Sequence, residues 1–430
     1  MINTATINIW GKQVGAIAWN SDTNIASFEY DPDFLKNQWD LSPLKMPHTQ
    51  AENKIYSFNE LRDSNTFKGI PGLIADVMPD KYGNTLINAW LAQRGRPSDS
   101  MNPVEILCFV GKRGMGALEF EPTVPKGNNT ASKIELDSLI NTAQQILSSK
   151  EQFGANLEKD EEKALLDILK IGTSAGGARA KAVIAYNPLT NEVRSGQADA
   201  PEGFSHWLIK FDGVADAQLG TASGYGKVEM AYHLMAVDCG IEMTECRIIE
   251  ENNRAHFITK RFDRTAENKK IHLQSFCALT HYDFQDIYSY SYEQIFETMR
   301  VLHLPYLQAE QLYRRMVFNV LARNCDDHTK NFAFMMDKDG VWKLSPAYDI
   351  CHAYRPGSAW VSQHALSMNG KRTDINRDDL LSVAKQMNIK KANTIINQIY
   401  DVVQKWPEYA EKTSVNTKLL KAIYQTLIKV

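Results

Sequence analysis

The feature that most constrains the fold is a polar segment, residues 323–331, in which Asp326 and Asn331 lie five residues apart. This Asp-x-x-x-x-Asn spacing is typical of the catalytic loop of protein kinases. A second acidic residue, Asp349, follows after an apolar run at 332–336. Phosphoryl transfer needs a carboxylate that accepts the proton of the incoming hydroxyl group, and oxygen ligands for a divalent metal. The pattern therefore favours Asp326 as the base, with Asn331 and Asp349 as ligands of Mg²⁺.

The same segment is also compatible with a polar turn between two helices, in which Asp and Asn act as caps. Its other polar residues fit either interpretation. His328 could touch phosphate or orient the base, and Lys330 could help to hold the transferring phosphate. Asp327 is expected to be structural. The rest of the chain has to decide between the two interpretations.

Length and composition indicate an ordinary globular protein. The chain has 430 residues, 43% of them hydrophobic and 23% charged, which predicts two or three domains. The net charge of −3 gives no reason to expect direct binding to nucleic acid. No signal peptide and no apolar run of about 18 residues is visible, so we expect a cytoplasmic protein without a membrane span. The six cysteines form no Cys-x-x-Cys pair and are expected to be reduced.

Hydrophobic periodicity divides the chain into strand-rich and helical parts. The first thirty residues alternate as in an antiparallel meander. Further strands are predicted at 182–186, 206–211, 246–250 and 256–262, with an insertion of strands within 326–349. Helices are predicted at 73–78, 81–93, 103–109, 134–170, 229–239, 378–387, 391–403 and 416–428.

This order predicts an α+β, protein-kinase-like two-lobed fold. We expect a strand-rich N-terminal lobe, preceded by a small β/α subdomain, and a helical C-terminal lobe. The predicted domains are residues 1–122, 123–265 and 266–430, with a first boundary in the Pro/Gly/Asn-rich stretch 122–130.

A second motif, residues 172–181, could bind phosphate. Its small residues would let backbone N–H groups approach phosphate oxygens, although it is neither a Walker loop nor Gly-x-Gly-x-x-Gly. Arg179 and Lys181 add positive charge, and the hydroxyl of Ser174 could lie beside the terminal phosphate and become phosphorylated itself. A flexible turn before a strand is the alternative. The expected ATP contacts here are Ser174, Ala175, Gly176, Gly177 and Lys181.

Lys210 lies inside an apolar strand, where a lysine that points inward needs a partner or a ligand. It could contact the α- and β-phosphates, or alternation along the strand could turn it to solvent. Glu229 is expected to open the next helix. It could pair with Lys210, but we favour a first-turn acid stabilised by the helix dipole.

Residues 260–264 follow a strand and precede the helical lobe, which is where a hinge that binds adenine would lie. Lys260 and Phe262 are the expected contacts there. The alternative is a charged strand exit in which Arg261 pairs with Asp263.

Several motifs together resemble the HipA family of bacterial serine/threonine kinase toxins, which pair with HipB-type antitoxins. Two segments near the N-terminus match as well, so the resemblance extends from about residue 5 to about residue 425. The matching segments are residues 70–80, 110–118, 174–181, 260–264, 324–331 and 347–350.

The resemblance implies ATP and Mg²⁺ as cofactors, a base at Asp326, metal ligands at Asn331 and Asp349, and a phosphate contact at Lys210. It implies that autophosphorylation of Ser174 silences the kinase, because added negative charge would repel the ATP phosphates. The implied partners are a HipB-like helix-turn-helix antitoxin, DNA only through that antitoxin, and a protein substrate such as an aminoacyl-tRNA synthetase. The remaining expected ATP contacts are Lys260, Phe262, His328, Lys330 and Tyr348.

The chain departs from the best-known family member in the 174–181 loop and at Lys260, where that member has an acidic residue. These departures leave the substrate open. Three other functions use some of the same residues or partners: a small-molecule phosphotransferase, a corepressor in an antitoxin–DNA complex, and a metal-dependent hydrolase using Asp326, Asp327 and His328. The hydrolase leaves Lys210 unexplained, and the phosphotransferase explains neither the meander nor the Ser174 loop.

Overall fold

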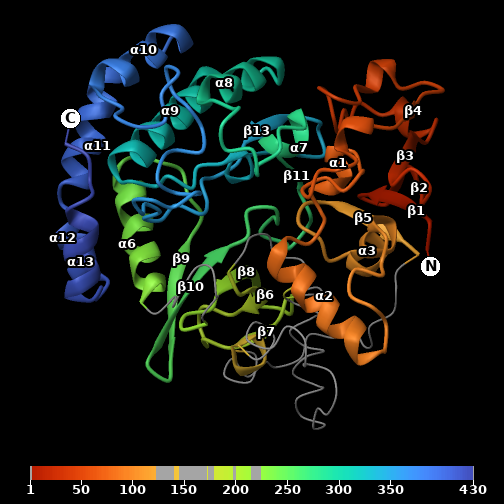
Figure 1. Cartoon of the computed structure of the whole chain (residues 1–430), viewed down its shortest axis with the longest axis horizontal. Helices are drawn as coiled ribbons and strands as arrows, with labels where there is room; N and C mark the ends of the chain where they lie inside the picture. Colours follow the sequence, from red (N-terminus) through yellow and green to blue (C-terminus); the bar gives the residue numbers. More distant parts are fainter. Residues whose placement is uncertain are drawn as a thin grey trace. The chain divides into compact units, whose positions relative to one another are not determined.

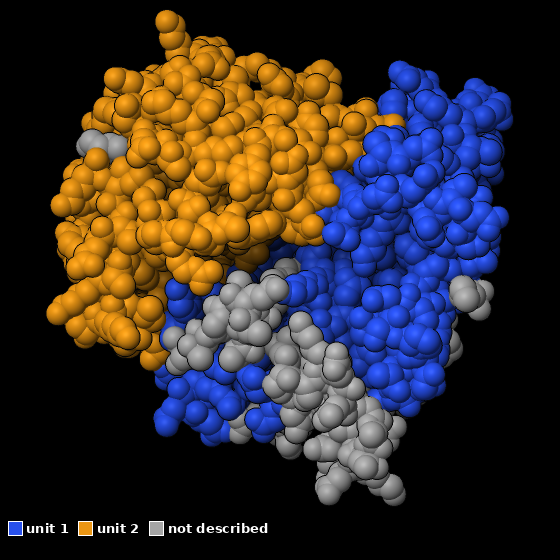
Figure 2. All heavy atoms as spheres, viewed as in Figure 1, with its two compact units in different colours: residues 1–42, 46–226, 247–273 blue, residues 43–45, 227–246, 274–430 orange. Residues whose placement is uncertain are grey.

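The computed structural model describes residues 2–122, 140–144, 172, 179–196, 200–214 and 224–429. The chain divides into two compact units, shown in blue and orange in Figure 2. Unit 1 comprises residues 1–42, 46–226 and 247–273, and unit 2 comprises residues 43–45, 227–246 and 274–430.

Unit 1 begins with a five-stranded sheet in the order β4-β3-β2-β1-β5 (Figure 1). Neighbouring strands of this sheet pair antiparallel, and the predicted meander of the first thirty residues is confirmed. β1 buries every second residue, because alternate side chains of a strand face the core. The strands are β1 (Thr4–Ile9), β2 (Lys12–Asn20), β3 (Ile25–Tyr30), β4 (Ile55–Tyr56) and β5 (Leu118–Glu121).

Three helices accompany this sheet, at the predicted places. α3 begins after Asn102, whose side chain accepts the N–H of Glu105 while Pro103 occupies the first helical position. Short 3₁₀ helices fill the loops. The helices are α1 (Gly72–Ala75), α2 (Lys81–Gln93), α3 (Pro103–Val110), η1 (Phe34–Lys36), η2 (His48–Gln50) and η3 (Asn59–Leu61).

A second five-stranded sheet in unit 1 has the order β7-β6-β8-β10-β9. Strand β6, which lies between β7 and β8, is buried along its whole length. The four predicted strands are present, whereas the short β7 was not predicted. The strands are β6 (Lys181–Tyr186), β7 (Val193–Ser195), β8 (Ser205–Lys210), β9 (Cys246–Glu251) and β10 (Arg254–Lys260).

Unit 2 is mainly helical and packs around one apolar core. Capping boxes start two of its helices: Ser291 with Gln294 at α8, and Asn376 with Asp379 at α10. The helices are α6 (Tyr225–Asp238), α7 (Phe276–Thr280), α8 (Tyr292–Val301), α9 (Tyr306–Leu321), η4 (Thr329–Asn331), α10 (Arg377–Met387), α11 (Ala392–Val403), α12 (Trp406–Lys412) and α13 (Thr417–Tyr424). The predicted strand insertion is the hairpin β12 (Ala333–Met336) and β13 (Trp342–Leu344), which extends the short β11 (His272–Ser275).

The structure corrects one local prediction. α6 begins at Tyr225, so Glu229 lies beyond its first turn and does not open the helix. Glu229 is buried, and the interpretation as a first-turn acid stabilised by the helix dipole is wrong. The predicted helix at 134–170 falls outside the described residues except for 140–144, which are helical.

All six cysteines are free, and five of them are buried. Along the described stretches, no helix combines the length and the apolar character that crossing a membrane requires.

Candidate active site

The predicted catalytic loop follows α9 in unit 2. α9 ends at Leu321, and Arg323 takes a positive φ of 56°, which turns the chain out of the helix. The loop is then fixed by a strand-like contact: Asn324 bridges Ala353 in parallel, and the N–H of Cys325 donates to the carbonyl of Ala353 at 3.0 Å. The segment is therefore an anchored loop, and Asp326 and Asn331 lie within it.

Asp327 is the buried anchor of this loop. Its side chain is fully buried and accepts hydrogen bonds from the Tyr292 hydroxyl at 2.7 Å, His364 Nδ1 at 2.8 Å and the N–H of Ala365 at 2.8 Å. Burial alone would lower the pKa of His364, but the Asp327 carboxylate raises that pKa to about 10. The structural role expected for Asp327 agrees with this network.

Asp326 is in a different environment from its neighbour. Its Oδ1 accepts one hydrogen bond, from the indole Nε1 of Trp360 at 2.9 Å, and His328 Nε2 lies 3.9 Å from the same oxygen. Oδ2 has no hydrogen-bond partner within the described part of the chain, and the side chain is 40% exposed. Restricted contact with water raises the pKa of Asp326, as do the nearby charges of Asp349 and Asp327, whereas His328 and Trp360 oppose the shift. A raised pKa and a free oxygen suit a general base.

Asn331 and Asp349 lie close to this carboxylate. Asn331 Nδ2 donates to the carbonyl of Asp326 at 2.6 Å, which leaves its Oδ1 available as an acceptor. Asp349 has a φ of +53°, and both side chains line a cavity of about 10 Å³. The hydroxyl of Tyr348 donates to the carbonyl of Lys330 at 2.6 Å, which ties the two segments together. One carboxylate and one amide oxygen fit the ligand set expected for Mg²⁺.

An aromatic cluster borders Asp326. The ring of Phe284 lies 5.1 Å from that of His328 and 6.4 Å from that of Trp360. Lys330 Nζ lies 4.9 Å from the centre of the same Phe284 ring. His328 and Lys330 were predicted from the loop, whereas Phe284, Trp360 and His364 were missed because they lie far from it in sequence. Trp360 offered one signal, a large aromatic side chain directly after the turn-forming run 355–359.

The predicted phosphate lysines lie in the second sheet of unit 1. Lys181 at the start of β6 and Lys210 at the end of β8 are direct partners across the antiparallel pair, so their side chains face the same side of the sheet. Lys181 is buried, and Lys210 Nζ lies 5.8 Å from the centre of the Phe257 ring. The phosphate contacts of both lysines remain a prediction.

The predicted hinge contains a buried ion cluster. Arg261 makes two hydrogen bonds with the carboxylate of Asp263, at 2.8 and 2.7 Å, and Arg264 donates to it at 2.8 Å. The N–H of Gly116 adds a fourth donor at 2.7 Å. Burial would raise the pKa of Asp263, but the two guanidinium groups hold it well below its usual range. The Arg261–Asp263 pair of the alternative interpretation is thus present, while the adenine contacts of Lys260 and Phe262 remain a prediction.

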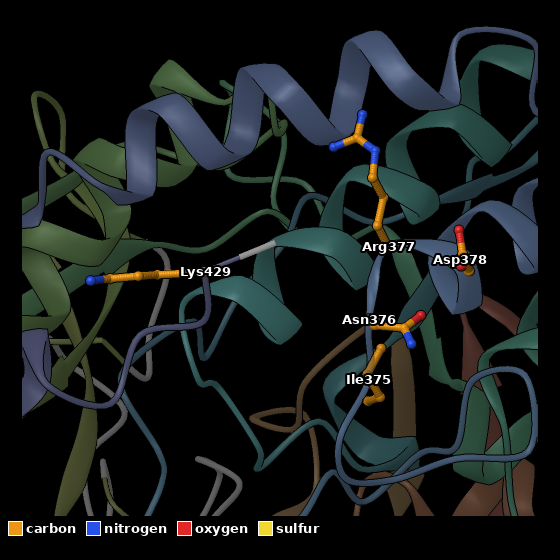
Figure 3. A pocket seen from close by; sticks show the side chains of 5 residues that line it. All are labelled: Ile375, Asn376, Arg377, Asp378 and Lys429. Atoms are coloured by element: carbon orange, nitrogen blue, oxygen red, sulfur yellow. The ribbon is translucent and has the colours of Figure 1, made fainter.

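The ATP contacts predicted for residues 174–177 remain a prediction. Ser174, Ala175, Gly176 and Gly177 lie outside the described residues. A hollow of about 310 Å³ in unit 2 is lined by Ile375, Asn376, Arg377, Asp378 and Lys429. In Figure 3 the side chain of Lys429 points away from the other four side chains, so the polar groups that line the hollow do not converge on one point.

The chain is similar to one protein family along most of its length. A family model described as HipA N-terminal domain matches residues 5–121, and one described as HipA-like C-terminal domain matches residues 173–406, more than half of the chain. A solved structure of the toxin–antitoxin system HipA and HipB with its operator DNA, from Shewanella oneidensis MR-1, matches with a TM-score of 0.66 at 15% identity. That match covers 98% of this chain and 94% of the other. At this identity the likeness shows the fold, which is mixed α/β and kinase-like with two lobes.

Two further proteins match over smaller parts of the chain. A Sinorhizobium fredii protein named "Putative kinase Y4dM" is 22% identical over 296 residues, which is 64% of this chain and 68% of that protein. The Helicobacter pylori proinflammatory kinase CtkA matches at 14% identity over 58% of this chain and 92% of its own, with a TM-score of 0.33. The latter score is too low to carry an argument.

Proposed function

The chain belongs to the HipA family, and on that premise we propose that it is an ATP- and Mg²⁺-dependent serine/threonine protein kinase that acts as a HipA-like toxin. The observation that carries the proposal is the state of Asp326. One of its oxygens is held by Trp360 at 2.9 Å, the other has no hydrogen-bond partner among the described residues, and the side chain is 40% exposed. A carboxylate held in this way can receive a proton from an incoming hydroxyl group.

Asn331 and Asp349 would hold the metal. The amide donor of Asn331 is used within the loop, so its oxygen is available, and Asp349 lines the same small cavity. Mg²⁺ held by these residues would supply positive charge that offsets the charge of the ATP phosphates. In unit 1, Lys181 and Lys210 face each other on neighbouring strands and would contact the phosphates. The loop with Ser174, and the hinge with Lys260 and Phe262, complete the proposed ATP contacts.

We propose a HipB-like antitoxin as the partner, with DNA reached only through that antitoxin. The Shewanella complex contains HipA, HipB and operator DNA, and the net charge of −3 offers no basis for direct DNA binding by this chain. The proposed substrate is a cellular protein that serves translation, such as an aminoacyl-tRNA synthetase. Autophosphorylation of Ser174 would silence the kinase, because phosphate charge would repel ATP.

Intact-mass spectrometry tests this function. Purified wild-type protein incubated with ATP and Mg²⁺ should gain one phosphate group, and peptide mapping should place it on Ser174. Wild-type protein that stays unmodified would count against a kinase.

Expression in a bacterial host separates catalysis from other effects. We expect the wild-type chain to slow growth and Asp349→Ala to relieve the effect, because that variant lacks a proposed metal ligand. Equal toxicity of the two proteins would point to a non-catalytic role, such as that of a corepressor.

A further inference from the structure

Trp360 comes from a short turn that fixes its backbone close to Asp326. The N–H of Arg355 donates to the carbonyl of Val361 at 3.2 Å, which closes the turn. The hydroxyl oxygen of Ser358 accepts the N–H groups of Trp360 and Val361, both at 3.2 Å. Gly357 supplies a φ of +75° at the tip, a conformation that glycine adopts without strain. The turn therefore holds Trp360 through its own hydrogen bonds.

The indole ring is fixed at its other end as well. Its Nε1–H donates to Asp326 Oδ1 at 2.9 Å, and the ring meets Phe284 edge to face, with centroids 6.4 Å apart and planes at 81°. Edge-to-face contacts of this kind are favourable. Trp360 is still 37% exposed, so burial alone does not explain why a large apolar residue lies here.

The hydrogen bond decides which way the Asp326 carboxylate faces. With Oδ1 engaged, Oδ2 is the oxygen left to act as a base. Without the indole, the next polar group at Oδ1 is His328 Nε2, which is 3.9 Å away, so the carboxylate would be free to turn toward it. A general base has to lie about 2.6–3.2 Å from the proton donor, and small misplacements are costly.

We propose that Trp360 is a positioning residue for phosphoryl transfer, whose indole N–H fixes the Asp326 carboxylate so that Oδ2 receives the proton of the incoming hydroxyl group. This inference rests on the proposed kinase function. In that step the hydroxyl oxygen bonds to the γ-phosphorus of ATP, and its proton moves to Oδ2. The bond from the γ-phosphorus to the oxygen shared with the β-phosphate breaks, and ADP leaves with the electron pair.

Trp360→Phe tests the proposal, because it removes the N–H and keeps an aromatic ring. The rate of phosphate incorporation is measured by mass spectrometry over a series of ATP·Mg²⁺ concentrations. We expect the maximal rate to fall about tenfold, part of the roughly 10²–10⁴-fold that a general base contributes, while the half-saturating ATP concentration stays the same.

Trp406→Phe is the matched control. Trp406 is fully buried in the same unit and also donates its indole N–H, to the carbonyl of Leu420 at 3.0 Å. We expect this variant to lose thermal stability and to keep the wild-type rate. A similar loss of rate in both variants would mean that Trp360 acts only through stability, and would overturn the proposal.

A second measurement tests the contact itself. In protein labelled with ¹⁵N-tryptophan, the indole proton signal that Trp360→Phe removes should shift in Asp326→Asn. A signal that does not move would overturn the contact. Wild-type protein without phosphate would reject the kinase function and this inference together, whereas an active wild type with an equal or faster Trp360→Phe rate would reject this inference alone.

Discussion

Two aspartates, Asp263 in unit 1 and Asp326 in unit 2, lie in opposite environments. The Asp263 side chain is fully buried and accepts four hydrogen bonds from Arg261, Arg264 and the N–H of Gly116. Asp326 is 40% exposed, accepts a single hydrogen bond and has a histidine 3.9 Å away. The pKa of the first is lowered and that of the second is raised.

The two environments determine what each carboxylate can do. Asp263 is satisfied by its partners, so it stabilises the junction between residues 114–116 and the end of β10 but has no free oxygen for a reaction. Asp326 is held on one side only, and the negative charges of Asp349 and Asp327 make it a better proton acceptor. The carboxylate whose oxygens all accept hydrogen bonds therefore has a structural role here. The carboxylate with an oxygen that accepts none from the described residues is the candidate catalytic group.

The largest effect is expected for Asp263→Asn. It would leave two buried guanidinium groups without their counter-charge, and breaking a buried ion pair costs about 3–5 kcal/mol. Urea unfolding of the variant should show this loss. Asp33→Asn is the control, since the exposed Asp33–Lys36 pair in the same unit should add no measurable stability. An equally small loss of stability in Asp263→Asn and Asp33→Asn would show that the ion cluster around Asp263 does not stabilise unit 1.

The stability lost in Asp263→Asn is expected to depend on pH. Because the folded pKa of Asp263 lies below the usual value of about 3.9, its contribution is complete above about pH 4 and is lost as the pH falls further. The stability difference between wild type and Asp263→Asn should therefore shrink on acidification from about pH 5 to about pH 3. A difference that is constant over this range would contradict the lowered pKa.

A smaller effect is expected at the anchor of the catalytic loop. His364→Gln removes a charged hydrogen bond to Asp327, which predicts a loss of about 1.5–3 kcal/mol at neutral pH. The folded pKa of His364 is raised to about 10, above the unfolded value of about 6.5. Its contribution is therefore complete below about pH 6.5 and is lost as the pH rises through about 10. Unfolding curves measured from about pH 6 to about pH 10 should show that the stability difference between wild type and His364→Gln becomes smaller as the pH rises.

His352→Gln is the control for alkaline pH. Burial lowers the pKa of His352 to about 4, so this residue is neutral throughout that range. The difference between wild type and His352→Gln should therefore stay constant from about pH 7 to about pH 10. If both histidine variants behave alike, the Asp327–His364 ion pair is not formed.

The smallest effect on stability is expected for Asp326→Asn. Because the pKa of Asp326 is raised on folding, ionisation of this carboxylate opposes the folded state above about pH 4. The variant should be as stable as the wild type or slightly more stable at neutral pH, by less than about 1 kcal/mol. A clear loss of stability in denaturant unfolding would place Asp326 among the structural carboxylates, beside Asp263.

The spacing of the candidate site residues and part of the fold could be predicted from local sequence. The spacing of Asp326, Asn331 and Asp349 is readable along the chain, as is the period-2 alternation of the first three strands. Each of these signals lies within one short segment, where residue type and spacing already fix which side chains are close.

The partners of the two carboxylates could not be predicted as readily. Trp360 is 34 residues from Asp326, and Ala365 is 38 residues from Asp327, so only the folded loops bring them together. Gly116 reaches Asp263 across 147 residues. The facing of Lys181 and Lys210 likewise depends on strand register, which neither strand specifies alone.

The role of Asp326 is tested by the rate at which Asp326→Asn takes up phosphate from ATP and Mg²⁺, measured on protein that unfolds at the wild-type denaturant concentration. We expect the rate to fall by at least about 100-fold, because the carboxylate that receives the proton is gone while the fold is kept. A stable variant that takes up phosphate at the wild-type rate would contradict the assignment of Asp326 as the catalytic base.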